Sequence, residues 1–181
     1  TTDAKIIPVL MRRFLDEGHE PIEAFRETVN RLEGSLAIAL ETDRAPGQVF
    51  LALRGSGQSI YIGLAHDRIV YASEVYGLVE ETPRYVRMDG EALRDPGDAG
   101  SCGQIFRIDP SRGTGLEVLE GFWFDGTPLV LGAEEVRTAE ITTRDIDRKG
   151  FDHFFAKEIA EAPRSVAGTL RGKYEFHRSG N

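Results

Sequence analysis

The sequence predicts an α+β fold, in which helices and antiparallel strands occupy separate stretches of the chain. Three observations predict it: two amphipathic helical stripes come first, a run of short alternating segments follows, and a helical stripe closes the chain. A parallel, doubly wound sheet would require strands and helices to alternate. The chain does not show that alternation, so the strands are expected to form antiparallel sheets.

The first 34 residues predict two helices. Residues 3–17 begin at a possible N-cap, Asp3, and end before Gly18. A second helix is expected to begin at Pro21, because proline suits the first helical turn, and to end at Gly34. The apolar positions recur at helical spacing in both segments: Ile6, Ile7, Leu10, Met11, Phe14 and Leu15, then Ile22, Phe25, Val29 and Leu32.

The middle of the chain changes to a period of two, which is typical of strands. Strands are predicted over residues 35–41, 48–53, 59–64, 68–72, 84–88, 104–108, 116–119, 122–124 and 129–131. Residues 89–103 are rich in Asp, Gly and Pro and predict an exposed loop, and residues 133–149 predict an irregular segment. Apolar residues 151–159 predict a helix, followed by a further helical turn that Pro163 begins.

The composition and charge of the chain exclude some classes of function. With 181 residues, 40% apolar and 29% charged, the chain predicts one ordinary globular domain with a tail. The net charge of −8 argues against nucleic-acid and anionic-membrane partners, and no apolar run approaches the ~18 residues that span a bilayer. Without a secretion signal, and with a single cysteine, the chain is expected to be cytoplasmic.

Few residues carry recognisable chemistry. Cys102 lies in a Gly-Ser-Cys-Gly loop without a nearby histidine, so a plain loop cysteine is favoured over a nucleophile. Thr1 precedes a helix, whereas an N-terminal nucleophile normally begins a strand. The histidines are scattered without metal-ligand spacing, so no metal site or cofactor is expected: His19, His66, His153 and His177.

Two further features each have two interpretations. Gly55-Ser56-Gly57 follows a predicted strand but completes no phosphate-binding pattern, so a hairpin connection is the better interpretation. Asp3 has two interpretations. It is a helix cap, or it is a carboxylate beside a site that holds the ammonium group of a ligand.

Three stretches resemble the glutamine-dependent glucosamine-6-phosphate synthases. Residues 2–10 are similar to the family's S-D-T-E-V-I-A-x-L segment, and residues 31–37 to its L-x-G-A-Y-A. Residues 52–64 and 71–74 resemble A-A-R-x-G-S-P-L-V-I-G-L-G and F-x-A-S-D. The tail, residues 151–163, is similar to a connector containing K-E-I-x-E-Q-P, although Ala160 and Ala162 depart from that pattern.

The resemblance implies a fold and a place within a larger enzyme. The implied fold is the four-layer α/β/β/α sandwich of N-terminal-nucleophile hydrolases, present here only in part. Residues 1–149 would be the rear portion of a glutamine amidotransferase domain, and residues 150–181 a connector helix leading to an absent sugar isomerase domain. The family's nucleophilic cysteine and its oxyanion-hole Asn-Gly pair would precede Thr1, so this chain is expected to be inactive alone.

The resemblance also implies partners. Asp3 matches the family aspartate that binds the α-amino group of glutamine, and a sugar phosphate would bind the absent domain. Open sheet edges would favour a homo-oligomer or a partner strand. Two alternatives remain: a non-catalytic glutaminase-like module retained for assembly, and an unrelated ligand-binding α+β domain whose matching stretches are accidental.

Overall fold

The structure is a computed structural model that describes residues 3–98, 101–140, 148 and 150–170. Asp3 and residues 168–170 are described by their backbone alone. The chain divides into two compact units, Thr1–Thr142 and Thr143–Asn181, and each is described by itself.

Two helices that contact each other open the first unit. The 3-10 turn η1 (Asp3–Lys5) leads into α1 (Ile6–Asp16), and α2 (Pro21–Asn30) follows with proline in its first turn. Each helix buries one stripe: Met11 and Phe14 from α1, and Ala24, Phe25, Thr28 and Val29 from α2. The N-cap position of α1 is Lys5, so the prediction that Asp3 caps this helix is wrong: Asp3 is the first residue of the 3-10 turn.

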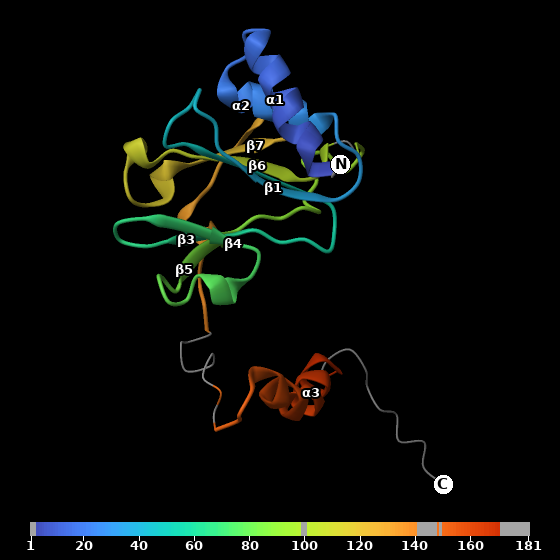
Figure 1. The fold of residues 1–181 in the computed structure, drawn as a ribbon, viewed down its shortest axis with the longest axis vertical. Helices are drawn as coiled ribbons and strands as arrows, with labels where there is room; N and C mark the ends of the chain where they lie inside the picture. Colours follow the sequence, from blue (N-terminus) through green and yellow to red (C-terminus); the bar gives the residue numbers. More distant parts are fainter. Residues whose placement is uncertain (1–2, 99–100, 141–147, 149, 171–181) are drawn as a thin grey trace. The chain divides into compact units, whose positions relative to one another are not determined.

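The helices cover one face of a five-stranded antiparallel sheet (Figure 1). Its order is β1-β2-β6-β7-β8, with β1 (Leu36–Leu40), β2 (Val49–Arg54), β6 (Gln104–Ile108), β7 (Leu119–Trp123) and β8 (Pro128–Leu129). Alternate residues of β2 and β6 point up to the helices, where Phe50, Ala52 and Ile105 join Phe14 and Phe25 in one core.

The opposite face of that sheet packs on a second, four-stranded antiparallel sheet (Figure 1). Its order is β4-β3-β5-β9, with β4 (Ile69–Ala72), β3 (Tyr61–Leu64), β5 (Arg84–Arg87) and β9 (Val136–Thr138). Apolar side chains from both sheets form the second core between them: Leu51, Leu53, Ile60, Ile62, Leu64, Val86, Met88, Phe106, Ile108, Val118 and Leu119.

The predicted α+β class is confirmed, with two antiparallel sheets and helices on one side. The outer face of the second sheet is partly covered by the segment after β4, which contains the 3-10 turn η2 (Val75–Gly77). Leu78 and Thr82 of this segment pack against Gly63 of β3. Within residues 3–140, as far as they are described, no α-helix covers this outer face, so the described layers are helix, sheet and sheet.

Two connections differ from the predictions. Residues 55–57 do not make a hairpin, because β2 already has β1 and β6 on its two sides and β3 belongs to the other sheet. They carry the chain from one sheet to the other, with Gly55 at φ +82° and Gly57 at φ +80°. Residues 116–118 form the 3-10 turn η5 (Leu116–Val118), and β7 starts only at Leu119.

The segment predicted to be irregular contains regular structure. Residues 133–138 form the 3-10 turn η6 (Ala133–Glu135) and then β9, which pairs with β5. In β9, Val136 lies opposite the buried Val86, while Arg137 and Thr138 are exposed. A three-residue edge strand needs only one apolar residue facing inward, so it leaves no alternating pattern to detect.

The second unit contains α3 (Phe154–Leu170). The sequence predicts that Pro163 begins a separate helical turn. This prediction is wrong, because Pro163 lies inside α3. Four large apolar side chains of α3 are exposed within the unit: Phe154, Phe155, Ile159 and Val166. Across both units, no helix of the described residues combines the length and apolarity that crossing a bilayer demands.

Candidate functional site

A groove of about 350 Å³ lies beside the N-terminal turn. Three segments that are distant in sequence line it: Ala4, Ile6 and Ile7 at the start of α1; Leu32, Glu33, Ser35, Leu36, Ala37 and Ile38 after α2 and in β1; and Gln58 before β3. Seven of the ten lining residues are apolar, and the polar side chains are those of Glu33, Ser35 and Gln58. A hollow that combines apolar walls with a few polar groups is the usual form of a small-molecule site.

Asp3 is the residue that directly precedes the groove wall. Its backbone forms the first residue of η1, next to Ala4, which lines the groove. Its side chain lies outside the described part of the structure, so the role assigned to Asp3 from sequence stays a prediction. Thr1 and Thr2 also lie outside the described residues.

Arg54 holds the far wall of the groove in place. This residue ends β2, and its guanidinium donates to the carbonyl oxygens of Leu32 and, at 3.3 Å, Gly34. Burial lowers the pKa of Arg54, while the nearby Cys102 acts in the opposite direction. Because these bonds satisfy two carbonyls of the loop after α2, they set the position of the residues that lead into β1.

Gly55 allows the second loop to approach the first. A Cβ atom on this residue would lie 2.3 Å from the Ser35 Oγ, and its φ of +82° is one that other residues rarely adopt. Its N–H donates to the Gly90 carbonyl at 2.7 Å, which ties the loop to the segment after β5. The close contact between Gly55 and Ser35 brings Gln58 within reach of the groove.

Cys102 is partly buried, although its loop context predicted exposure. Its thiol donates to the Gly90 carbonyl oxygen at 3.1 Å, and its backbone makes an isolated antiparallel bridge with Leu93. A nucleophilic thiol needs a base that accepts its proton, and here the hydrogen bond goes to a backbone carbonyl. The geometry therefore favours the structural interpretation of Cys102.

The two histidines of the first unit, His19 and His66, lie in different connections of the chain. His19 packs edge-on against the Phe14 ring at 5.6 Å, His66 is exposed in the turn before β4, and His153 is exposed in the second unit. His177 lies outside the described residues. Among the residues with described positions, no three His, Cys, Asp or Glu side chains gather closely enough to hold a metal ion.

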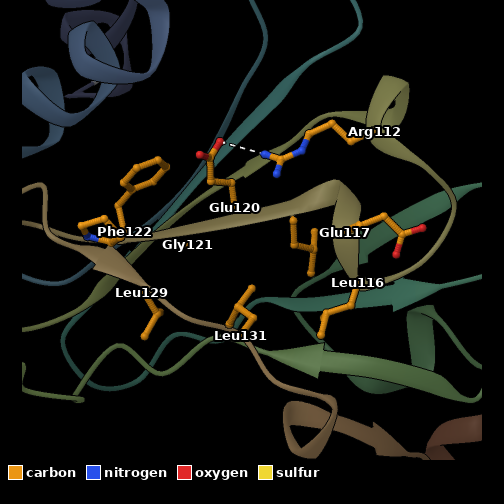
Figure 2. A pocket seen from close by; sticks show the side chains of 10 residues that line it. Arg112, Leu116, Glu117, Glu120, Gly121, Phe122, Leu129 and Leu131 are labelled. Atoms are coloured by element: carbon orange, nitrogen blue, oxygen red, sulfur yellow. Dashed lines mark hydrogen bonds and ion pairs between the residues drawn. The ribbon is translucent and has the colours of Figure 1, made fainter.

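A second hollow, of about 290 Å³, lies along β7 and was not predicted from the sequence. Figure 2 shows Leu116, Leu129 and Leu131 gathered on one side, with the Glu120–Arg112 ion pair on the other. That pair spans 3.1 Å, and Glu120 also accepts from Arg107. The residues that line this hollow come from β7, β8 and the turn η5, together with Arg112 and Leu131, and their contacts arise only once the strands have paired.

The charged groups of this second hollow are already used within the protein. Besides the Glu120 pairs, the Glu117 carboxylate accepts from the N–H groups of Thr114 and Gly115 at 3.2 and 3.0 Å. Backbone N–H groups of Glu117 itself, Gly115 and Thr114 lower the pKa of this carboxyl group. The groove beside Asp3 is therefore the stronger candidate for a ligand site.

Comparisons with known proteins agree with the motif resemblance. The chain is 28% identical over 170 residues to the isomerising glutamine–fructose-6-phosphate aminotransferase of Methanothermobacter thermautotrophicus, covering 93% of this chain and 25% of that protein. The proteins of the same name from Sulfolobus acidocaldarius and Geobacillus kaustophilus are each 28% identical, over 93% and 96% of this chain and 25% of their own length. No protein-family profile matches the chain.

These relatives share one name, and the similarity to each of them covers 93–96% of this chain. The resemblance that the motifs predict is confirmed: over nearly its whole length the chain is similar to the isomerising glutamine–fructose-6-phosphate aminotransferases, of which it spans about a quarter.

Proposed function

We propose that this chain is part of a glutamine amidotransferase that supplies ammonia for making glucosamine 6-phosphate from fructose 6-phosphate. The observation that carries the proposal is the similarity, over 93% of the chain, to aminotransferases that are named for glutamine and fructose 6-phosphate. The groove at the start of α1 supports it, because it offers a small-molecule site beside the residue that matches the family's amine-binding aspartate.

The finer architecture belongs to the same proposal. The helices and the two stacked antiparallel sheets would be three of the four layers of an N-terminal-nucleophile sandwich. The fourth layer would cover the outer face of β3 and β5. Residues 1–149 would form the glutaminase portion, and residues 150–181, which contain α3, would lead to a sugar isomerase domain.

In this proposal Asp3 binds the ammonium group of glutamine. A carboxylate paired with an ammonium ion makes a charge-assisted hydrogen bond, and it selects a free amino acid over a glutamine side chain within a peptide. The apolar wall formed by Ile6, Leu36 and Ile38 would contact the methylene groups of the ligand. Neither contact requires a cofactor.

Glutamine binding tests this assignment. Titration of the 181-residue chain with L-glutamine, followed by amide shifts in an NMR spectrum, should move Ala4, Ser35, Ala37 and Gln58. N-acetyl-L-glutamine, which lacks the ammonium group, should bind about tenfold or more weakly, and Asp3→Asn should lose the difference between the two ligands. Asp43→Asn, which removes an exposed carboxylate that does not line the groove, is the control.

Glutamine binding without hydrolysis separates the amidotransferase proposal from the assembly module. The only thiol of the chain, on Cys102, donates to a backbone carbonyl, so these 181 residues are expected to bind glutamine without hydrolysing it. Ammonia release that persists in Cys102→Ala with a blocked Thr1 amine would contradict this expectation. A chain that binds neither L-glutamine nor its acetylated form would favour the non-catalytic module.

A further inference from the structure

The connection between β5 and β6 forms a strap that is closed on itself. The name refers to residues 90–98 and 101–103, the parts of this strap that the structure describes. The two ends are joined where the Gly103 N–H donates to the Ala92 carbonyl oxygen at 2.9 Å. The buried Ser101 hydroxyl bonds backbone groups of the outer part. The strap is therefore a compact loop that is held by its own hydrogen bonds.

Both ends of the strap lie against the corner that Arg54 and Gly55 form after β2. The Gly90 carbonyl accepts from the Gly55 N–H at 2.7 Å, and a Cβ on Gly90 would lie 2.5 Å from the Gly55 carbonyl oxygen. A Cβ on Gly103 would lie 2.5 Å from the Leu53 carbonyl oxygen and 3.0 Å from the Arg54 Cα. Only residues without a side chain allow so close an approach. The positions of the strap and of the corner are therefore fixed together.

The same corner holds the groove at the start of α1. The Arg54 guanidinium bonds the carbonyl oxygen of Leu32, and Gly55 packs on Ser35. Both Leu32 and Ser35 line the groove, whereas none of the described strap residues does. The strap thus reaches the groove through the corner, without lining it.

An ion pair attaches the outer part of the strap to the turn after β7. The Arg94 guanidinium pairs with the Asp125 carboxylate, and the two side chains are 44% and 36% exposed. Asp125 directly follows Phe124, whose ring lies under the Arg54 guanidinium. Because exposed ion pairs contribute little to global stability, this pair can be broken without unfolding the protein.

We propose that the strap is a positioning element for the groove, so that the affinity for glutamine depends on a segment that does not line the site. This inference rests on the proposed function, which assigns glutamine to the groove. A loop opens at a lower free energy than the whole domain. When the strap leaves the corner, Gly55 loses its bond to Gly90, and the Ser35 wall loses its support. The apparent affinity then falls in proportion to the fraction of chains whose strap is in place.

Two alanine substitutions within the strap form a matched test of this role. Gly90→Ala places a Cβ against the Gly55 backbone, whereas the Cβ of Gly97→Ala meets only the Asp95 carboxylate, at 3.3 Å. Neither glycine has a positive φ, so the two changes differ in this contact. We expect Gly90→Ala to weaken the binding of L-glutamine to the 181-residue chain by about tenfold, and Gly97→Ala to leave it unchanged.

Breaking the outer ion pair tests the same role without disturbing a close contact, and it decides the matter if Gly90→Ala does not fold. Arg94→Ala should weaken L-glutamine binding by about twofold or more, because the strap then keeps only its attachment at the corner. Arg13→Ala, which breaks the exposed Arg13–Glu17 pair of α1, is the control and should leave the binding unchanged.

Hydrogen exchange supplies a readout that a purely structural role would not change. The N–H groups of Gly55 and Gly103 donate to strap carbonyls, and neither residue lines the groove. Because coupling between two sites is reciprocal, L-glutamine should slow the exchange of both amides in the wild-type chain. Exchange rates that do not respond to bound L-glutamine would overturn the coupling.

The outcomes separate this inference from the proposed function. If wild type, Gly90→Ala and Arg94→Ala bind L-glutamine equally well, the positioning role is wrong and the proposed function stands. If the wild-type chain does not bind L-glutamine, the proposed function fails. The strap is then tested in the free chain, where Gly90→Ala should move the amide resonances of Ser35 and Gln58 more than Gly97→Ala does. Equal shifts in the two variants would overturn the positioning role.

Discussion

The Arg54 guanidinium lies over the Phe124 ring, with its central carbon 5.0 Å from the ring centroid. Arg54 ends β2, and Phe124, which follows β7, is buried in the core beneath the helices. The same guanidinium bonds the carbonyls of Leu32 and Gly34. One side chain thus joins the sheet, the aromatic core and the loop that forms the far wall of the groove.

Replacing Arg54 should therefore loosen the groove as well as the fold. We expect Arg54→Ala to lower the free energy of unfolding by about 1–2 kcal/mol, because the half-buried Leu32 carbonyl and the exposed Gly34 carbonyl lose a charged donor. Arg54→Lys keeps the charge but not the planar fork, so an intermediate loss is expected. Urea denaturation measures both. Equal stability of the lysine and wild-type chains would show that the stacked, forked geometry contributes nothing.

Gly55 and Gly57 form a matched pair for testing the loop contact. Both have positive φ, but only a Cβ on Gly55 meets Ser35, whereas a Cβ on Gly57 has no atom within 4 Å. Gly57→Ala should lower the free energy of unfolding by about 1 kcal/mol, because its backbone conformation alone disfavours a side chain. Gly55→Ala should lower it by clearly more.

The Ser35→Gly change supplies the control for this comparison. It removes the Oγ and Cβ atoms that a Cβ on residue 55 would meet at 2.3 and 2.9 Å. The Gly55→Ala/Ser35→Gly chain should therefore recover most of the excess loss, as measured by thermal unfolding. A double variant no more stable than Gly55→Ala would mean that the loops do not depend on this contact.

Most strands could be predicted from sequence because each buries one face. In β1, for example, Leu36, Ile38 and Leu40 face the helices and alternate with exposed alanines. The pairing order could not be predicted, since β2 pairs with β6 across a gap of about fifty residues that alternation does not encode. The sequence predicts that one helix ends and another begins at Pro163, because proline has no N–H to donate within a helix. In the structure α3 continues through Pro163.

The candidate site was only partly accessible from sequence. Asp3 could be selected because it lies in a segment resembling a known family. The groove itself needs the start of α1, the residues after α2 and Gln58 to meet, and this depends on the Arg54 bonds and on the missing side chain at Gly55. Those contacts are non-local, so local patterns do not report them.

Arg26 of α2 links the helix to the loop after β7 through a mostly buried charge. Its Nη1 donates to the Phe124 carbonyl at 2.9 Å, and Asn30 donates to the same oxygen at 2.9 Å. Its other nitrogens pair with the carboxylates of Glu23 and Glu27. The hydrogen bond from Arg26 lowers the pKa of Glu23, despite an opposing effect of burial.

The lowered pKa of Glu23 predicts a pH-dependent contribution to stability. Because the folded-state value lies below the ordinary 4.5, ionised Glu23 stabilises the fold above pH 4.5, and this contribution is lost as the pH falls through the folded-state value. We expect the stability difference between wild type and Glu23→Gln to be largest near neutral pH and to shrink in acid, measured by urea denaturation across that range. In an Arg26→Ala background the same substitution should show little pH dependence. A difference that stays constant down to low pH in both backgrounds would contradict the assignment to the Glu23–Arg26 pair.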